Sequence, residues 1–188
     1  SCILKGYQRS VRENLRLAER RGVSVVVDTR GERLEEFLQV YYSTMERRGA
    51  SSTYFFPRSL FMALGEKLPE QLTYFHATYE NRVVSTELQL ISGRHTYAFL
   101  GGTTAEGLAI RANPALRHST NLWGSEHGKT HMVFGGSHRE NDGLFDYKKR
   151  FAPHGIKMFR VGTCILDPAR YQSLVDQRTA WECQTASG

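Results

Sequence analysis

The sequence predicts an α/β fold: one domain with a mixed, mostly antiparallel sheet and helices on both faces. Segments with helical periodicity alternate with short apolar, β-branched runs along the chain. Two of these runs, residues 72–79 and 83–91, are separated by a short turn at Glu80-Asn81, which is typical of an antiparallel hairpin. A chain of 188 residues suits one domain, so we expect it to span residues 1–188.

The first third of the chain is predicted to be mainly helical. A leading basic helix occupies residues 4–21 of the segment 1–22, with arginines on one face and apolar residues on the other. A short buried strand follows at residues 23–27, and a second helix covers residues 32–48. After a flexible loop at 49–52, Pro57 suits the first turn of a third helix that reaches about residue 67.

The remaining elements alternate between strands and helices. After the hairpin, a third strand at residues 95–100 ends in Gly101-Gly102, and a loop of small residues leads to a helix that begins at Asn113-Pro114 and reaches about residue 128. We then expect a strand at 132–134, a helix at 144–151 and a last long strand at 157–165. Asp167-Pro168 caps a closing helix through residue 175, and residues 177–188 are expected to form a loose tail.

Composition restricts the partners and the chemistry. The net charge of +6 favours anionic partners in general. The three cysteines, Cys2, Cys164 and Cys183, lack a CxxC spacing and fit a reducing compartment, so we expect a cytoplasmic protein without a disulfide framework. No apolar run approaches the ~18 residues of a membrane span, and no signal peptide opens the chain. Because Gly128 interrupts the pair His127 and His131, we expect no metal site.

Several stretches resemble one known family in the same order along the chain. Residues 134–155, FGGSHRENDGLFDYKKRFAPHG, contain a Gly-rich strand end, then Gly143-Leu144, Tyr147-Lys148 and Phe151. This pattern resembles the FemAB-type branch of the GNAT superfamily of acyltransferases. Residues 97–116 (YAFLGGTTAEGLAIRANPAL), 12–25 (RENLRLAERRGVSV) and 164–174 (CILDPARYQSL) are also similar to segments of that family. The resemblance implies a GNAT-like fold.

The chain also departs from that family in ways that bear on the acyl donor. Relatives that build peptidoglycan bridges usually carry two such domains, and some carry a helical arm that holds tRNA, whereas this chain has one domain and no arm. Tyr147 stands where the family more often has Phe. The stretch TTAEGLAIRANP is an imperfect version of the phosphate loop of acetyl-CoA-binding relatives. The resemblance therefore leaves two donors open, acyl-CoA and aminoacyl-tRNA.

Four residues are candidates for catalysis. The family match places Lys148 in the cleft, where a cation can hold a phosphate or stabilise an oxyanion; the alternative is a solvated lysine in a basic run. Tyr97 and Tyr147 offer hydroxyls for proton relay, or are half-buried aromatics. Glu87, within a strand, could deprotonate the attacking amine if burial raises its pKa; otherwise it lies on an exposed face or in a structural ion pair.

Other residues are candidates for binding. The loop before the fourth helix offers backbone N–H groups and Arg111 to the phosphates of the donor, and the alternative is a surface loop in which Asn113 serves as an N-cap. The donor-binding set is Thr103, Thr104, Ile110, Arg111, Ala112 and Asn113. For the acceptor we expect Arg47, His138 and Arg139, while Asp142 and Asp146 are further acidic candidates.

The resemblance implies transfer of an acyl or aminoacyl group to an amine acceptor, such as a muropeptide precursor of the cell wall. The amine would attack directly, in agreement with the absence of a Gly-x-Ser-x-Gly nucleophile motif. Two alternatives remain open: a GNAT-like domain that binds without catalysis, and a tRNA-binding module whose basic helix contacts phosphates. The sequence does not indicate the oligomeric state.

Overall fold

The computed structural model describes residues 2–136 and 143–185. These residues divide into two compact units, 1–156 and 157–188. The first unit contains all the strands of the described chain, and the second contains one helix.

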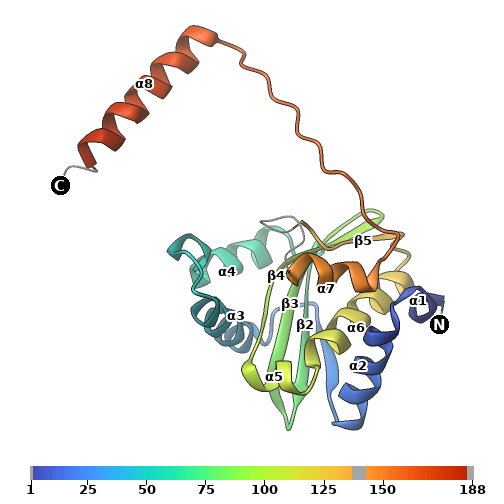
Figure 1. The fold of residues 1–188 in the computed structure, drawn as a ribbon. Coiled ribbons are helices and arrows are strands. Elements are labelled where there is room, and N and C mark those ends of the chain that lie inside the picture. Colours follow the sequence, from blue (N-terminus) through green and yellow to red (C-terminus); the bar gives the residue numbers. More distant parts are fainter. Residues whose placement is uncertain (1, 137–142, 186–188) are drawn as a thin grey trace. The chain divides into compact units, whose positions relative to one another are not determined.

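The first unit is built on a five-stranded sheet with the order β1-β2-β3-β4-β5 (Figure 1). Its strands are β1 (Ser24–Asp28), β2 (Leu72–Tyr79), β3 (Arg82–Ser92), β4 (His95–Thr103) and β5 (His131–Val133). Neighbouring strands from β1 to β4 are antiparallel, whereas β4 and β5 are parallel. The turn between β2 and β3 places Glu80 and Asn81 at positive φ, as a tight hairpin turn requires.

Helices cover both faces of this sheet. The chain begins with α1 (Cys2–Gly6) and α2 (Arg9–Arg20), and continues after β1 with α3 (Leu34–Arg48), a 3-10 turn η1 (Ser52–Tyr54) and α4 (Arg58–Lys67). After β4 come α5 (Ala105–Ala109) and α6 (Ala112–Glu126), and α7 (Gly143–Phe151) follows β5. Figure 1 shows α3 and α4 on one side of the sheet and α2 and α6 on the other.

Two hydrophobic cores fill the space between the sheet and its helices. On one face, Phe37 and Tyr41 of α3 and Phe61 of α4 pack against Tyr74 and Leu88. On the opposite face, Ala112 and Leu116 of α6 pack against Phe75, Ala77 and Val84. Because successive residues of a strand point to opposite faces, β2 contributes Tyr74 to one core and Phe75 to the other.

The predicted fold class is confirmed, since residues 1–156 form an α/β domain with a mixed sheet between two helical layers. Several boundaries were wrong. The leading helix is divided into α1 and α2, because Gly6 ends α1 and the chain turns at Tyr7 before α2 begins at Arg9. The segment expected to be a loop before α6 contains the short helix α5, which Thr104 caps by accepting a hydrogen bond from the Gly107 N–H (3.0 Å).

The expected N-cap of α6 is also wrong. The N-cap is Arg111, at φ 66°, rather than Asn113. The Asn113 side chain does not cap the helix, because its amide bonds instead to groups on β4 and α7. Helix α6 therefore begins without a side-chain cap.

The second unit differs from its prediction in two places. Residues 157–165 do not form the expected strand, and the apolar side chains of Met158 and Phe159 are 83% and 86% exposed. Strand propensity reports how well side chains fit a half-buried pleated surface, and no pairing with this segment occurs in the described chain. Helix α8 (Pro168–Thr185) continues through most of the predicted loose tail, since i,i+4 pairs such as Arg178–Glu182 (2.6 Å) support its later turns.

Candidate functional site: a cationic cleft with a buried carboxylate

A cleft of about 840 Å³ lies along the second half of β4 in the first unit. Its walls come from the second half of β4, the region where α5 meets α6, the first turns of α7 and the C-terminal end of α3. The size falls within the ~300–1,000 Å³ range of sites for small molecules and cofactors.

Glu87 of β3 is the carboxylate of this cleft, and it is only 6% exposed. Arg117 of α6 pairs with both carboxylate oxygens, and its Nη1 donates to Oε1 at 2.9 Å. The Gln89 side-chain amide donates to the same Oε1. Burial raises the pKa of Glu87, although Arg117 and Gln89 act in the opposite direction. The net effect is a raised pKa, which makes the carboxylate a better proton acceptor than an exposed one.

Arg117 also contacts the aromatic wall of the cleft. Its guanidinium carbon lies 4.9 Å from the centre of the Phe134 ring, which follows β5. A cation over an aromatic face is attracted by the ring quadrupole. The residue therefore links the buried carboxylate of the sheet to the segment between β5 and α7.

Tyr147 of α7 belongs to a chain of hydrogen bonds rather than standing free in the cleft. Its hydroxyl donates to the Asn113 side-chain carbonyl, and the amide of Asn113 donates to Thr103 Oγ1 at 3.2 Å. Thr103 Oγ1 lies 2.7 Å from Ser85 Oγ. Burial raises the pKa of Tyr147, so this phenol is a weak proton donor in the folded protein.

Lys148 lies one residue further along α7 and also lines the cleft. Its Nζ donates to the carbonyl oxygens of Gly136 (2.6 Å) and Gly135 (3.3 Å). Gly135 has φ of 69°, a conformation that glycine adopts without strain. Lys148 thus joins α7 to the segment that follows β5.

Four arginines add positive charge around the cleft: Arg47, Arg48, Arg111 and Arg150. Arg47 of α3 donates from Nη2 to the Thr103 carbonyl at 2.6 Å, which ties the end of α3 to the end of β4. Arg111 stands at the N-terminus of α6, where the helix dipole is positive. Such a cleft is suited to a ligand with phosphate groups.

The structure brings together seven of the candidate residues from the sequence. The cleft is lined by Arg47, Glu87, Thr103, Arg111, Asn113, Tyr147 and Lys148. Thr104 instead caps α5, and Ile110 and Ala112 pack in the core beneath α6. Tyr97 is 38% exposed and lies beside His95 rather than along the cleft. His138, Arg139 and Asp142 lie outside the described residues, and Asp146 is exposed in the first turn of α7.

Arg117 and Phe134 are cleft residues that the sequence analysis did not single out. One signal was available for Arg117. It follows Asn113 by four residues and so shares a helix face with it, and a buried glutamate needs a cation nearby. Phe134 offered no comparable signal, because its place beside the cleft depends on the path of the chain after β5.

Neither a metal centre nor a membrane span is found among residues 2–136 and 143–185. His127 stacks on Trp123 and His131 stacks on His95, and no cluster of three or more His, Cys, Asp and Glu within those ranges could hold a metal ion. No helix in the same ranges is both long and apolar enough to cross a bilayer.

Comparison with solved structures shows that the fold is shared by known transferases. FemX matches with a TM-score of 0.68 and 18% identity, over 79% of this chain and 55% of its own. An aminoglycoside acetyltransferase from an uncultured soil metagenomic sample, in complex with sisomicin, matches with a TM-score of 0.58 and 15% identity, over 77% of this chain and 97% of its own. AAC(6')-Iy in complex with the bisubstrate analogue CoA-S-monomethyl-acetylneamine matches with a TM-score of 0.52 and 12% identity, over 76% and 99%.

These identities establish the fold alone, and the chain spans only about half the length of FemX. No curated protein matches the sequence. Residues 5–149, however, match the sequence model of the acetyltransferase (GNAT) domain. This match extends over the sheet, α2 to α6 and most of α7, and it includes every described residue of the cleft except Arg150. The chain therefore belongs to the acetyltransferase (GNAT) family.

Proposed function

We propose that this chain transfers an acyl group from acyl-CoA to the amine of a small acceptor. The observation that carries the proposal is the cleft itself, in which the buried carboxylate of Glu87 and several cations line one cavity. The cations suit the phosphates of the coenzyme, and the carboxylate suits an amine that must lose a proton.

In the proposed reaction the acceptor nitrogen attacks the thioester carbonyl carbon directly. Glu87 accepts the proton that the amine loses, the new C–N bond forms, and the C–S bond breaks as the thiolate leaves and is protonated by solvent. Arg117 opposes the rise in the pKa of Glu87 that burial causes, and a carboxylate has enough lone pairs to accept a further proton beside this pair. The ammonium of Lys148 stabilises the negative charge that develops on the carbonyl oxygen.

The donor-binding role falls to the cationic end of the cleft. Arg111 and the uncapped N-terminus of α6 would contact the pyrophosphate, with Thr103 and Asn113 shaping the wall beside it. Arg47 and Arg48, at the end of α3, border the place where the acceptor would enter.

A second candidate donor is aminoacyl-tRNA, with a muropeptide as acceptor. The sequence resemblance to the FemAB-type branch and the likeness of the fold to FemX favour it. The same cationic cleft would then contact the phosphates of the tRNA acceptor end. The two donors are separated by whether coenzyme A alone stabilises the folded protein.

The proposal is tested by binding and by transfer. Coenzyme A at 100 times its dissociation constant is expected to stabilise the folded chain by about 2.7 kcal/mol, measured as a rise in melting temperature. Glu87→Gln is expected to slow acetyl transfer from acetyl-CoA to a panel of amines by roughly 10²- to 10⁴-fold, measured as release of free thiol.

Glu106→Gln serves as the matched control, because Glu106 is paired with Arg82 (3.0 Å) outside the cleft. It is expected to keep the rate of the unaltered protein. Equal rates for Glu87→Gln and the unaltered protein would remove Glu87 from the chemistry. Stabilisation by coenzyme A without transfer to any amine would favour a domain that binds without catalysis.

A further inference from the structure

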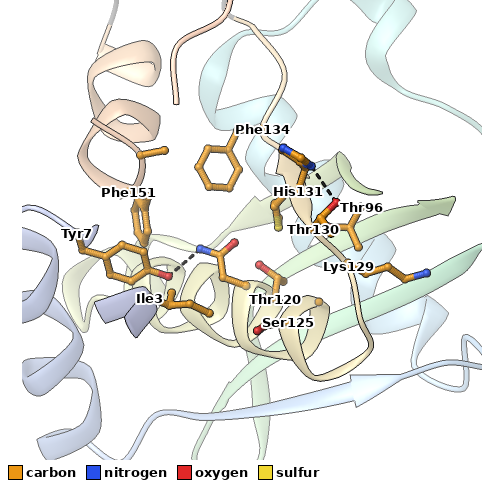
Figure 2. A pocket seen from close by; sticks show the side chains of 14 residues that line it. Ile3, Tyr7, Thr96, Thr120, Ser125, Lys129, Thr130, His131, Phe134 and Phe151 are labelled. Carbon is orange, nitrogen blue, oxygen red and sulfur yellow. Dashed lines mark hydrogen bonds between the residues drawn. The ribbon is translucent and has the colours of Figure 1, made fainter. Parts of the chain in front are cut away.

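A second cavity, of about 360 Å³, lies in the first unit and shares Phe134 with the cleft. It is bounded by α1 and the turn after it, by the C-terminal half of α6, by β5 and by the end of α7. Figure 2 shows the rings of Tyr7, Phe134 and Phe151 along one side and Thr96, Thr130 and His131 along the other. Its volume reaches the lower end of the ~300–1,000 Å³ range of ligand sites.

The lining of the second cavity combines an apolar wall with polar side chains. Its apolar lining consists of Ile3, Tyr7, Met132, Phe134, Phe151 and Ala152, and Gly124 leaves room on the α6 side. The Tyr7 hydroxyl accepts from the Asn121 amide at 2.7 Å, and Thr120 Oγ1 donates to the Arg117 carbonyl at 2.8 Å. The Lys129 ammonium is held by the carbonyls of Gly93 (2.9 Å) and Ser92 (3.3 Å). The Asn121 side-chain oxygen is buried without a hydrogen-bond partner among the described residues, so the second cavity offers one acceptor beside an apolar wall that suits an apolar group.

The second cavity is adjacent to the cleft. Phe134 lines both, and β4 contributes Ala98 to the cleft and Thr96 to the second cavity. Helix α6 also lines both of them. Arg117 lines the cleft, and Thr120, less than one turn further along the helix, lines the second cavity.

Helix α6 therefore runs past three different environments in order. Arg111 and the helix N-terminus are cationic, Arg117 meets the buried carboxylate of Glu87, and Gly124 borders the second cavity with its apolar wall. At 1.5 Å per residue, Arg111 and Gly124 are separated by roughly 20 Å along the helix axis. This sequence of environments fits an elongated ligand with an anionic end, a reacting centre and an apolar end.

We propose that the second cavity receives the acyl group of the donor, and that this group is a branched or aromatic acyl chain larger than acetyl. The inference rests on the proposed function, because it takes the anionic end of the ligand to be coenzyme A. An acetyl group would leave most of the second cavity unfilled, whereas a branched chain would contact Phe134 and Met132.

Calorimetry with three probes tests the inference: coenzyme A, acetyl-CoA and isovaleryl-CoA. Burial of a CH₂ group contributes about 0.8 kcal/mol, or about 4-fold in affinity, so isovaleryl-CoA is expected to bind roughly 10- to 60-fold more tightly than acetyl-CoA. Gly124→Leu, which fills the cavity from α6, is expected to remove this preference and to leave the affinity for coenzyme A within about 2-fold.

Gly124→Ala is the matched control. A Cβ at Gly124 would lie 3.7 Å from Lys129 Cβ and 3.9 Å from Thr96 Cγ2, which are ordinary contacts, so this variant should keep most of the preference. Met132→Trp fills the same cavity from β5 and covers the case in which Gly124→Leu does not fold, as judged by its melting curve.

The outcomes separate the two proposals. Absence of coenzyme A binding would overturn the proposed donor and the inference with it. Equal affinities for acetyl-CoA and isovaleryl-CoA, with coenzyme A bound, would overturn only the inference. A preference for isovaleryl-CoA that persists in folded Gly124→Leu and Met132→Trp would place the acyl chain elsewhere and also overturn it.

Discussion

At the scale of single residues, burial and Arg117 act in opposite directions on the pKa of Glu87. Burial raises the pKa of the carboxyl, and the nearby guanidinium is the largest influence that lowers it. The pair is nearly inaccessible, with side chains 9% and 8% exposed, so solvent screens the interaction weakly. The balance between these two effects would set the pH at which Glu87 begins to act as a base.

Replacement of Arg117 by Met should therefore move the pH–rate profile. Because the base acts in its ionised form, the rate rises as the pH rises through the pKa of Glu87, and loss of the cation raises that pKa further. The rising limb of the kcat/KM profile should shift to higher pH in Arg117→Met. The shift should be smaller in Arg117→Lys, which keeps a positive charge. Arg150→Met removes another cleft cation and is the control. A limb that stays in place in Arg117→Met would show that Glu87 is not the group that titrates.

Local sequence patterns predicted several residues that line the cleft, but they did not predict which residues these contact. Glu87, Tyr147 and Lys148 were identified from their residue types and from the resemblance, and all three line the cavity. That Glu87 meets Arg117 depends on how α6 lies across β3, which no local periodicity encodes. The hydroxyl by which Tyr147 differs from the more usual Phe is explained by its bond to Asn113.

At the scale of elements, Gly101 and Gly102 show why local patterns misplace a boundary. The pair suggested the end of a strand, yet β4 continues through both to Thr103. A Cβ at Gly101 would lie 2.5 Å from the Thr86 carbonyl oxygen, and one at Gly102 would lie 2.5 Å from Thr44 Oγ1. These glycines permit close approach of β4 to β3 and to α3. A Gly-Gly pair that is needed for close packing therefore looks, in the sequence, the same as a pair that forms a turn.

Gly102→Ala should consequently destabilise the contact between β4 and α3. The added methyl would also lie 2.8 Å from the Val40 carbonyl oxygen, so backbone must move, at a cost of about 1–3 kcal/mol in the free energy of unfolding. Urea denaturation measures this loss. Gly65→Ala in α4 has open space around its Cβ and is expected to gain about 0.4–1 kcal/mol instead. Equal stabilities for the two variants would mean that β4 does not need this close approach.

The elements themselves were largely predictable, because most bury one apolar face with a clear period. The strands β2 and β3 and the helices α3, α4 and α7 were all expected near their observed positions. The segments that were predicted wrongly depend on contacts with other parts of the chain. Helix α5 follows from the cap that Thr104 provides, and residues 157–165 have strand-like composition without a pairing strand in the described chain.

At the scale of the whole molecule, the buried pair of His76 and Asp28 connects strands β2 and β1 of the sheet. His76 is fully buried, with Nε2 3.6 Å from Asp28 Oδ2 and Nδ1 2.9 Å from Thr86 Oγ1. Burial would raise the pKa of Asp28, but backbone N–H groups of Arg33, Arg30 and Gly31 lower it on balance. Burial lowers the pKa of His76 and outweighs the attraction of Asp28. The folded protein therefore holds this histidine in its neutral form.

The stability of the first unit should depend on pH through His76. An unfolded histidine takes up a proton near pH 6.5, whereas the folded one does so only at lower pH, so the unfolded state binds more protons between these values. The free energy of unfolding should then fall as the pH falls below about 6.5, by at most about 1.4 kcal/mol per pH unit for this group. Depression of the pKa of Asp28 adds a further loss only below its ordinary value of 3.8.

Urea unfolding at pH 7.5, 6.5 and 5.5 measures this dependence, and His76→Gln isolates the contribution of one residue. The pKa of His118 is also lowered by burial, so the unaltered protein should lose stability through two histidines, and His76→Gln should show a shallower slope with His118 still present. His95→Gln, at the half-buried start of β4, is the matched control variant. If His76→Gln and His95→Gln gave the same slope, the sheet would have to open enough for water to reach the pair at mildly acidic pH.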